Sequence, residues 1–142
     1  MRSARREGLD RYVLDSFAVL AFLFGEEGAG EVKRILRKAE EGEAVVFFHW
    51  NNLAEVYYIV RRESSRRRAL EAIALVKAMP IRLIEFDESL WLKAAELKAT
   101  FPISYADSFA AATACTMDAK LVTGDPEFKA LGDLIAIHWL PR

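Results

Sequence analysis

Short apolar runs alternate with longer amphipathic segments along the chain. The runs are rich in β-branched and aromatic residues, and several are apolar throughout, which is typical of strands buried on both faces of a sheet. They predict strands over residues 12–14, 45–48, 82–86, 120–122 and 134–139.

The amphipathic segments predict helices between these strands. Residues 30–42, GEVKRILRKAEEG, place Val32, Ile35 and Leu36 on one face and charged residues on the other. Because strands and helices alternate, we expect an α/β fold with a mostly parallel central sheet of four to five strands, sandwiched by helices. The other predicted helices cover residues 16–24, 50–62, 65–79, 88–99 and 105–117.

Length and composition indicate one globular domain. The chain has 142 residues, of which 53% are hydrophobic, and we assign residues 9–142 to this domain and residues 1–8 to a flexible basic arm. The single cysteine, Cys115, excludes an internal disulfide and fits a reducing compartment, so we expect a cytoplasmic protein. The apolar run over residues 12–25 is interrupted by Asp15 and is too short to cross a bilayer, so no membrane association is expected.

Four acidic residues occupy corresponding places in this pattern. Asp15 follows the first predicted strand, and Asp125 follows the fourth in LVTGD. Glu55 lies in the first turns of the helix after the second strand, and Asp107 lies in the first turn of the helix that leads into the fourth. Because ligands of open α/β sheets bind outside the carboxyl ends of the strands, we expect these four side chains to converge there.

Each acid also has a purely local interpretation. Ser104 with Asp107 fits the helix-capping pattern, and Asn52 with Glu55 resembles it. The other two acids could cap a helix or initiate a turn. Taken one at a time, Asp107 and Glu55 are better explained as parts of caps.

The four acids together favour a metal site. Two carboxylates about 4 Å apart repel each other by roughly 4 kcal/mol at an effective dielectric constant near 20, and no lysine adjoins any of the four in sequence. Mg²⁺ or Mn²⁺ prefers oxygen ligands and would neutralise such a group. The two histidines and single cysteine of the chain disfavour zinc.

The ordered pieces resemble the PIN domain family, and within it the VapC-type toxins of type II toxin–antitoxin systems. The matching segments cover nearly the whole chain from Tyr12 onward. Ser16 and Thr123 stand where the family often has hydroxyl residues, whereas Asn51 and Asn52 replace a common Ser or Thr, and we expect an asparagine to cap that helix equally well. The segments are YVLDSFAVLAFL, NNLAEVYYIVRR, ISYADSFAAATA and KLVTGDPEF.

This resemblance implies a metal-dependent endoribonuclease that hydrolyses RNA phosphodiester bonds with Mg²⁺ or Mn²⁺. Asp15 and Asp107 would be the principal ligands, Asp125 would hold the same ion or a second one, and Glu55 would bind through water or orient the nucleophile. The resemblance also implies a homodimer and a cognate antitoxin that blocks the site.

Arginines cluster between two predicted helices. A solvated helix face is the simplest interpretation of residues 33–38, which are also basic, but this second cluster is denser and could contact RNA phosphates. Its members are Arg61, Arg62, Arg66, Arg67 and Arg68.

Several other functions remain open at the level of sequence. A PIN nuclease could serve RNA maturation, and an RNA-binding domain of this fold could lack catalysis. A phospho-receiver module needs an acidic pair after the first strand and a lysine after the last, but Ser16 follows Asp15, and IHWLPR contains no lysine. An aspartyl-nucleophile phosphatase needs a second aspartate two residues after the first, where Phe17 stands.

Overall fold

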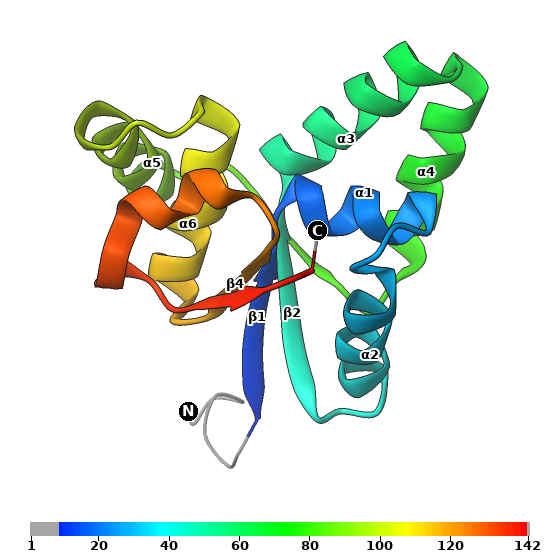
Figure 1. The fold of residues 1–142 in the computed structure, drawn as a ribbon, viewed down its shortest axis with the longest axis horizontal. Helices are drawn as coiled ribbons and strands as arrows, with labels where there is room; N and C mark the ends of the chain where they lie inside the picture. Colours follow the sequence, from blue (N-terminus) through cyan, green and yellow to red (C-terminus); the bar gives the residue numbers. More distant parts are fainter. Residues whose placement is uncertain (1–8, 142) are drawn as a thin grey trace.

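The computed structural model describes residues 9–141, and the expected basic arm at residues 1–8 lies outside this range. Five parallel strands form one sheet in the order β3-β2-β1-β4-β5 (Figure 1). The predicted α/β class is confirmed. The strands are β1 (Asp10–Leu14), β2 (Ala44–His49), β3 (Arg82–Ile84), β4 (Lys120–Thr123) and β5 (Ile137–Trp139).

Pairs of helices connect the first four strands, and the two helices predicted between β2 and β3 are confirmed. A 3₁₀ segment, η1, connects β4 to β5. The helical elements are α1 (Ser16–Phe24), α2 (Ala29–Glu40), α3 (Trp50–Glu63), α4 (Arg66–Ala78), α5 (Glu88–Thr100), α6 (Tyr105–Met117) and η1 (Pro126–Leu134).

Both edge strands are shorter than the sequence predicts. The third strand ends at Ile84, so the predicted strand over residues 82–86 is wrong at its end. The predicted strand over residues 134–139 is wrong at its start, because Leu134 still belongs to η1. The 3₁₀ segment η1 begins at Pro126. Two of its apolar residues, Phe128 and Leu131, are buried against one face of the sheet and do not pair in a strand.

The sheet separates two hydrophobic cores. Helices α1 to α4 cover one face, and α5, α6 and η1 cover the other (Figure 1). Alternate residues of β2 serve the two cores, with Val46 and Phe48 on the first side and Val45 and Phe47 on the second. All six residues of β2 are buried, as expected for a central parallel strand whose apolar run does not alternate.

The chain reverses its direction across the sheet between β1 and β4. From β1 it continues to β2 and β3 on one side, then returns to place β4 on the other side of β1. Crevices form where the strand order reverses in this way, outside the carboxyl ends of the two strands. Within residues 9–141, no helix is both long and apolar enough to cross a membrane.

Candidate active site

Asp15 and Asp125 follow the two strands that flank this reversal. Asp15 is 1% exposed, and its Oδ1 accepts a hydrogen bond of 2.9 Å from the Ala18 amide at the start of α1. Its Oδ2 accepts a hydrogen bond from the Thr123 hydroxyl, and the Thr123 oxygen accepts one of 3.0 Å from the Asp125 amide. The helix-capping interpretation of Asp15 is therefore correct, and the same carboxylate is also tied to the end of β4.

Close packing keeps these two segments together. Gly124 lies between Thr123 and Asp125, and a Cβ at this position would lie 2.4 Å from the ring of Phe17 on α1. A contact that short would force the half-buried ring of Phe17 to move away from the turn. The glycine therefore lets α1 approach the turn after β4, which brings the two aspartates toward the same space.

Glu55 joins this region through Ser16, whose hydroxyl donates to Glu55 Oε1 at 2.6 Å. The expected asparagine cap of α3 is wrong, because β2 continues to His49 and the helix begins at once at Trp50. His49 Nδ1 accepts from the Asn51 amide at 2.9 Å and caps the helix. Asn52 lies inside α3 and donates to the Ala106 carbonyl at 3.0 Å, so it fastens the start of α3 to the start of α6.

Asp107 is not used by the cap of its own helix. Ser104 caps α6 by accepting from the Asp107 amide at 3.1 Å, as the capping pattern predicts. The Ser104 amide, however, donates to Glu127 Oε1 at 2.7 Å instead of to the Asp107 carboxylate. In a complete capping box, the carboxylate of Asp107 would accept from the Ser104 amide. Glu127 accepts from that amide here, so the carboxyl group of Asp107 is available to the site. Asp107 is 5% exposed.

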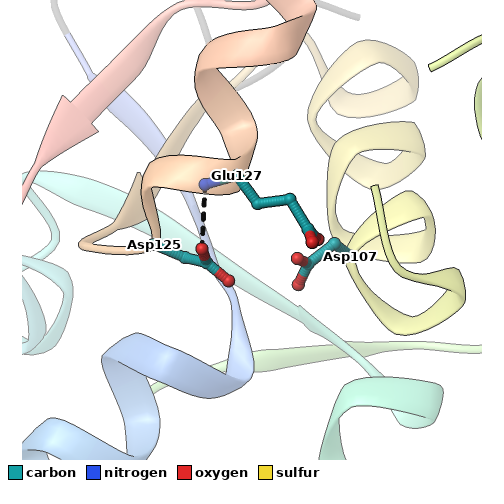
Figure 2. A group of neighbouring side chains, drawn as sticks. All are labelled: Asp107, Asp125 and Glu127. Carbon is teal, nitrogen blue, oxygen red and sulfur yellow. Dashed lines mark hydrogen bonds between the residues drawn. The ribbon is translucent and has the colours of Figure 1, made fainter. Parts of the chain in front are cut away.

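Three carboxyl groups converge in front of the switch point. Figure 2 shows Asp107 from α6, Asp125 from the turn after β4 and Glu127 from η1 pointing toward one another. One oxygen from each lies within 4.8 Å of the others, and Asp125 Oδ1 also accepts from the Glu127 amide at 2.9 Å. Asp15 and Glu55 lie outside this trio, but the negative charges of Asp125 and Glu55 both act on Asp15.

Glu127 was not predicted from the sequence. The sequence carried a signal for it, because Glu127 stands two residues after Asp125 in GDPEF, and Pro126 favours a tight turn that keeps both side chains at one edge. The five acids thus come from the link between β1 and α1, from α3, from α6 and from the segment after β4. The catalytic and metal-binding roles of the four predicted acids stay predictions.

Burial makes the ionised state of this group unfavourable. Burial raises the pKa of Asp15 to about 7, against the hydrogen bonds from Thr123 and Ala18, and the nearby charges of Asp125 and Glu55 add to the rise. Burial also raises the pKa of Asp107, and its hydrogen bond with Glu127 and the charge of Asp15 act in the same direction. The same hydrogen bond lowers the pKa of Glu127. The two shifts have opposite directions, so this hydrogen bond favours a protonated Asp107 beside an ionised Glu127.

The donor set fits a hard divalent cation. It consists of carboxylate oxygens, and no lysine or arginine of the described chain is among the groups with the largest effects on the pKa of Asp15 or Asp107. Lys98 acts on Glu127, but its ammonium group donates to the Ile103 carbonyl at 2.8 Å. Oxygen donors with unbalanced negative charge are what Mg²⁺ and Mn²⁺ prefer.

The raised pKa of Asp15 predicts how stability depends on pH. Without divalent ions, an aspartate with a raised folded-state pKa stabilises the fold at low pH and loses this effect as pH rises through about 7. His49 acts in the opposite direction, because burial lowers its pKa to about 4. We therefore compare wild type with Asp15→Asn, in which His49 is unchanged.

From about pH 5 to about pH 8, in chelator, we expect the free energy of unfolding of Asp15→Asn to rise relative to wild type by about 3 kcal/mol, because about two of the three pH units between the unfolded and the folded pKa lie in this window. Urea denaturation followed by circular dichroism measures this difference. Asp133→Asn, on the exposed surface of η1, is the matched control and should track wild type. A difference that does not change with pH would contradict the buried, proton-binding Asp15.

Comparison with known proteins places these observations in a family. The PIN domain family model matches residues 12–134. A search of curated proteins found no match. Among solved structures, the chain is similar to VapBC2 from Rickettsia felis bound to a promoter DNA fragment, with 16% identity, a TM-score of 0.73, and coverage of 92% of this chain and 99% of that one.

Two further structures give the same result. The chain is similar to VapC20 of Mycobacterium tuberculosis, a toxin that cleaves the sarcin–ricin loop, with 20% identity, a TM-score of 0.71, and coverage of 92% and 99%. DNA-bound VapBC from Salmonella typhimurium gives 16% identity, a TM-score of 0.71, and coverage of 92% and 98%. The family model spans most of the chain and the fold is that of these VapC-type proteins, so the chain belongs to the PIN domain family.

Proposed function

We propose that this protein is a metal-dependent endoribonuclease and the toxin of a type II toxin–antitoxin pair. The observation that carries the proposal is the convergence of the carboxyl groups of Asp107, Asp125 and Glu127 from separate segments at the switch point, next to the buried Asp15; within residues 9–141 no cationic side chain is among the strongest influences on the pKa of the two buried acids, Asp15 and Asp107. A purely structural role would not need this arrangement, because burying like charges costs free energy. Membership of the PIN domain family supports a nuclease.

Asp107 and Asp125, whose oxygens cluster with one of Glu127, would hold Mg²⁺ or Mn²⁺ together with Asp15, on which the charge of Asp125 acts. When bound, the ion supplies Lewis acidity at a phosphoryl oxygen and lowers the pKa of a water molecule for in-line attack. Asp107 gives up its proton on binding, so we expect affinity for the ion to rise with pH.

The hydroxyl residues act on the acids rather than on substrate. Thr123 fixes one oxygen of Asp15 and also the backbone of Asp125, so a single side chain sets the separation of two ligands. Ser16 fixes one oxygen of Glu55 and leaves the other to orient the attacking water. Glu55 is half-buried and reaches solvent, so its second oxygen is accessible to the water molecule that it is proposed to orient.

The path of RNA would follow α3 away from the acids. Glu55, Tyr58 and Arg62 lie at helical spacing on one face of α3, and the Arg62 guanidinium lies 5.4 Å from the centre of the Tyr58 ring. Seven residues of helix place Arg62 about 10 Å beyond Glu55. Arg61 and Arg62 end α3, whereas Arg66, Arg67 and Arg68 begin α4, and all five are exposed.

Three arginines in the first turn of α4 lie at the positive end of its dipole, and this turn contains no acidic residue. Each such charge costs roughly 0.3–1 kcal/mol. Arg67 pairs with Glu71 at 3.4 Å, but both side chains are largely exposed, so the pair contributes little. A polyanion bound across this hairpin would remove the repulsion, which supports a phosphate-binding role.

An antitoxin would occupy the groove between α1, α3 and α4. Similar VapB–VapC structures are toxin–antitoxin complexes, and here this groove exposes Phe24 by 46% and Leu75 by 49%. A partner in the groove would lie beside Arg68 and so compete with RNA.

We also propose a homodimer, because α5 presents Trp91 and Leu92 to solvent. Such a toxin would act on RNA in the cytoplasm, and the free Cys115 agrees with that compartment.

The other interpretations are less well supported. A nuclease of RNA maturation would use the same chemistry, and it differs only in its target and in lacking an antitoxin. A domain without catalysis would not need the costly burial of Asp15 and Asp107. The phospho-receiver interpretation is not retained, because the chain belongs to the PIN domain family.

Replacing Asp15 by asparagine should abolish cleavage without unfolding the protein. The substituted amide keeps the size of the side chain and removes the charge that would bind the ion, so we expect the rate to fall about a thousand-fold, or about 4 kcal/mol in the barrier. Cleavage of a fluorescent RNA in Mg²⁺, in Mn²⁺ and in chelator measures this, with Asp133→Asn as the matched control. Full activity of Asp15→Asn, or of wild type in chelator, would refute the proposed chemistry.

Removing two charges from the arginine cluster where α3 meets α4 should weaken RNA binding and reduce the salt dependence of that binding. For Arg62→Gln/Arg66→Gln, the slope of log affinity against log salt should fall by about 0.7 for each lost phosphate contact. Fluorescence anisotropy in chelator reads binding without cleavage. Lys33→Gln/Arg37→Gln removes the same charge from the exposed face of α2 and should leave the slope unchanged. Equal slopes for the two double variants would show that the arginine cluster between α3 and α4 does not contact RNA.

A charge in the groove should prevent binding of the antitoxin without affecting the homodimer. We expect Leu75→Asp to elute alone, with the mass of a dimer, when it is co-expressed with the product of the neighbouring gene. Light scattering after gel filtration gives both masses. Leu134→Asp, at a residue that is also 46% exposed but lies on η1, should still form the complex. A complex that survives Leu75→Asp places the antitoxin elsewhere.

A further inference from the structure

Two aromatic side chains are exposed at the carboxyl edge of the sheet, outside the acidic cluster. Phe86 follows β3 and is 56% exposed, and Tyr105, the first residue of α6, is 55% exposed. Single exposed aromatic residues are common on protein surfaces. These two rings, however, pack against the same buried side chain, although they are distant in the sequence.

The support is the buried side chain of Phe109. The ring of Tyr105 meets that of Phe109 edge to face, with centroids 5.2 Å apart, and the ring of Phe86 does the same at 5.5 Å. His49, which is 0% exposed, lies 4.8 Å from Phe86 and 4.9 Å from Phe109. Edge-to-face packing of this kind fixes ring orientation. The exposed parts of the two rings are therefore held in place before any ligand arrives.

The aromatic pair lies close to the acids but on the other side of α6. Asp107 and Phe109 are two residues apart on this helix, so their side chains point to nearly opposite sides. Asp107 meets Glu127 on η1, whereas Phe109 meets His49 at the end of β2. The width of one helix, about 10 Å, separates the two places. At about 3.4 Å per stacked nucleotide, a strand of RNA with its scissile phosphate at the acids would reach the rings within about three nucleotides.

Charge explains why a neutral contact is needed here. The acidic site repels the phosphates that it must receive, and the chain has a net charge of −1, so overall charge does not attract RNA. Stacking of a base on an aromatic ring needs no cation and is tolerant of sequence. It does require a base that is not already stacked in a duplex, and such bases occur in single strands and loops.

We propose that Phe86 and Tyr105 form a stacking platform for an unpaired nucleobase near the scissile phosphate. The proposal rests on the proposed ribonuclease function, and it adds a base-binding subsite to that site. The contribution of the rings is binding and positioning. It is independent of the ion and can be measured without cleavage.

The test uses a short single-stranded RNA and a series of copies that lack one base at successive positions. In chelator, we expect wild type to bind one abasic copy about ten-fold more weakly than the intact RNA. Phe86→Ala/Tyr105→Ala should bind the intact RNA about ten-fold more weakly and should no longer distinguish that copy. Tyr105→Phe should behave as wild type. Leu134→Ala, which removes a 46% exposed apolar side chain from η1, is the control and should have no effect.

The measurements distinguish failure of the platform from failure of the nuclease proposal. If wild type distinguishes the abasic copy but cleaves no RNA in Mg²⁺ or Mn²⁺, the platform stands and the nuclease proposal fails. If RNA is cleaved but every abasic copy binds equally, the platform is overturned and the nuclease proposal stands. If the double variant becomes monomeric and still distinguishes the abasic copy, the rings belong to an interface between copies of the chain, which also overturns the platform.

Discussion

The burial of carboxyl groups at the β1–β4 switch point is the constraint on which the rest of the structure depends. Asp15 is almost fully enclosed, and its two oxygens accept from Thr123 and from the start of α1. Those hydrogen bonds offset only part of the cost of burial, because the pKa of Asp15 is still raised to about 7. The fold thus encloses an acid whose strongest interactions within residues 9–141 include no cationic side chain. This is a cost in stability that selection for folding alone would remove.

The parallel sheet is what makes this arrangement possible. Strands that all point one way bring their carboxyl ends to one edge, and the reversal at β1 separates the helices that follow β1 and β4. Small contacts then set the spacing of the acids. Gly124 admits the ring of Phe17, Ser16 holds Glu55, and Asn52 joins α3 to α6. None of these residues carries the chemistry, but a change in any one of them would move an acid relative to its neighbours.

The sequence predicted the parts that depend on short-range pattern, and it missed those that depend on tertiary contacts. Continuous apolar runs identified β1, β2 and β4, because strands buried on both faces leave that pattern. The edge strands β3 and β5 were predicted too long, since their apolar residues serve loops and η1 instead. The acids were found because each follows a strand or opens a helix. Glu127 was missed because its importance comes from Ser104, which is 23 residues away, and no local pattern reports that contact.

Capping and catalysis are not competing explanations for these acids. Asp15 and Asp125 each use one oxygen to cap the element that follows and turn the other away from that cap, so the cap fixes the direction of the carboxyl group. Asp107 is freed from its cap only because Glu127 accepts from Ser104 in its place. A carboxylate oriented by a helix start costs little additional entropy to position. The local interpretation of each acid therefore describes how its side chain is held, and the convergence of Asp107, Asp125 and Glu127 is what supports the proposed metal site.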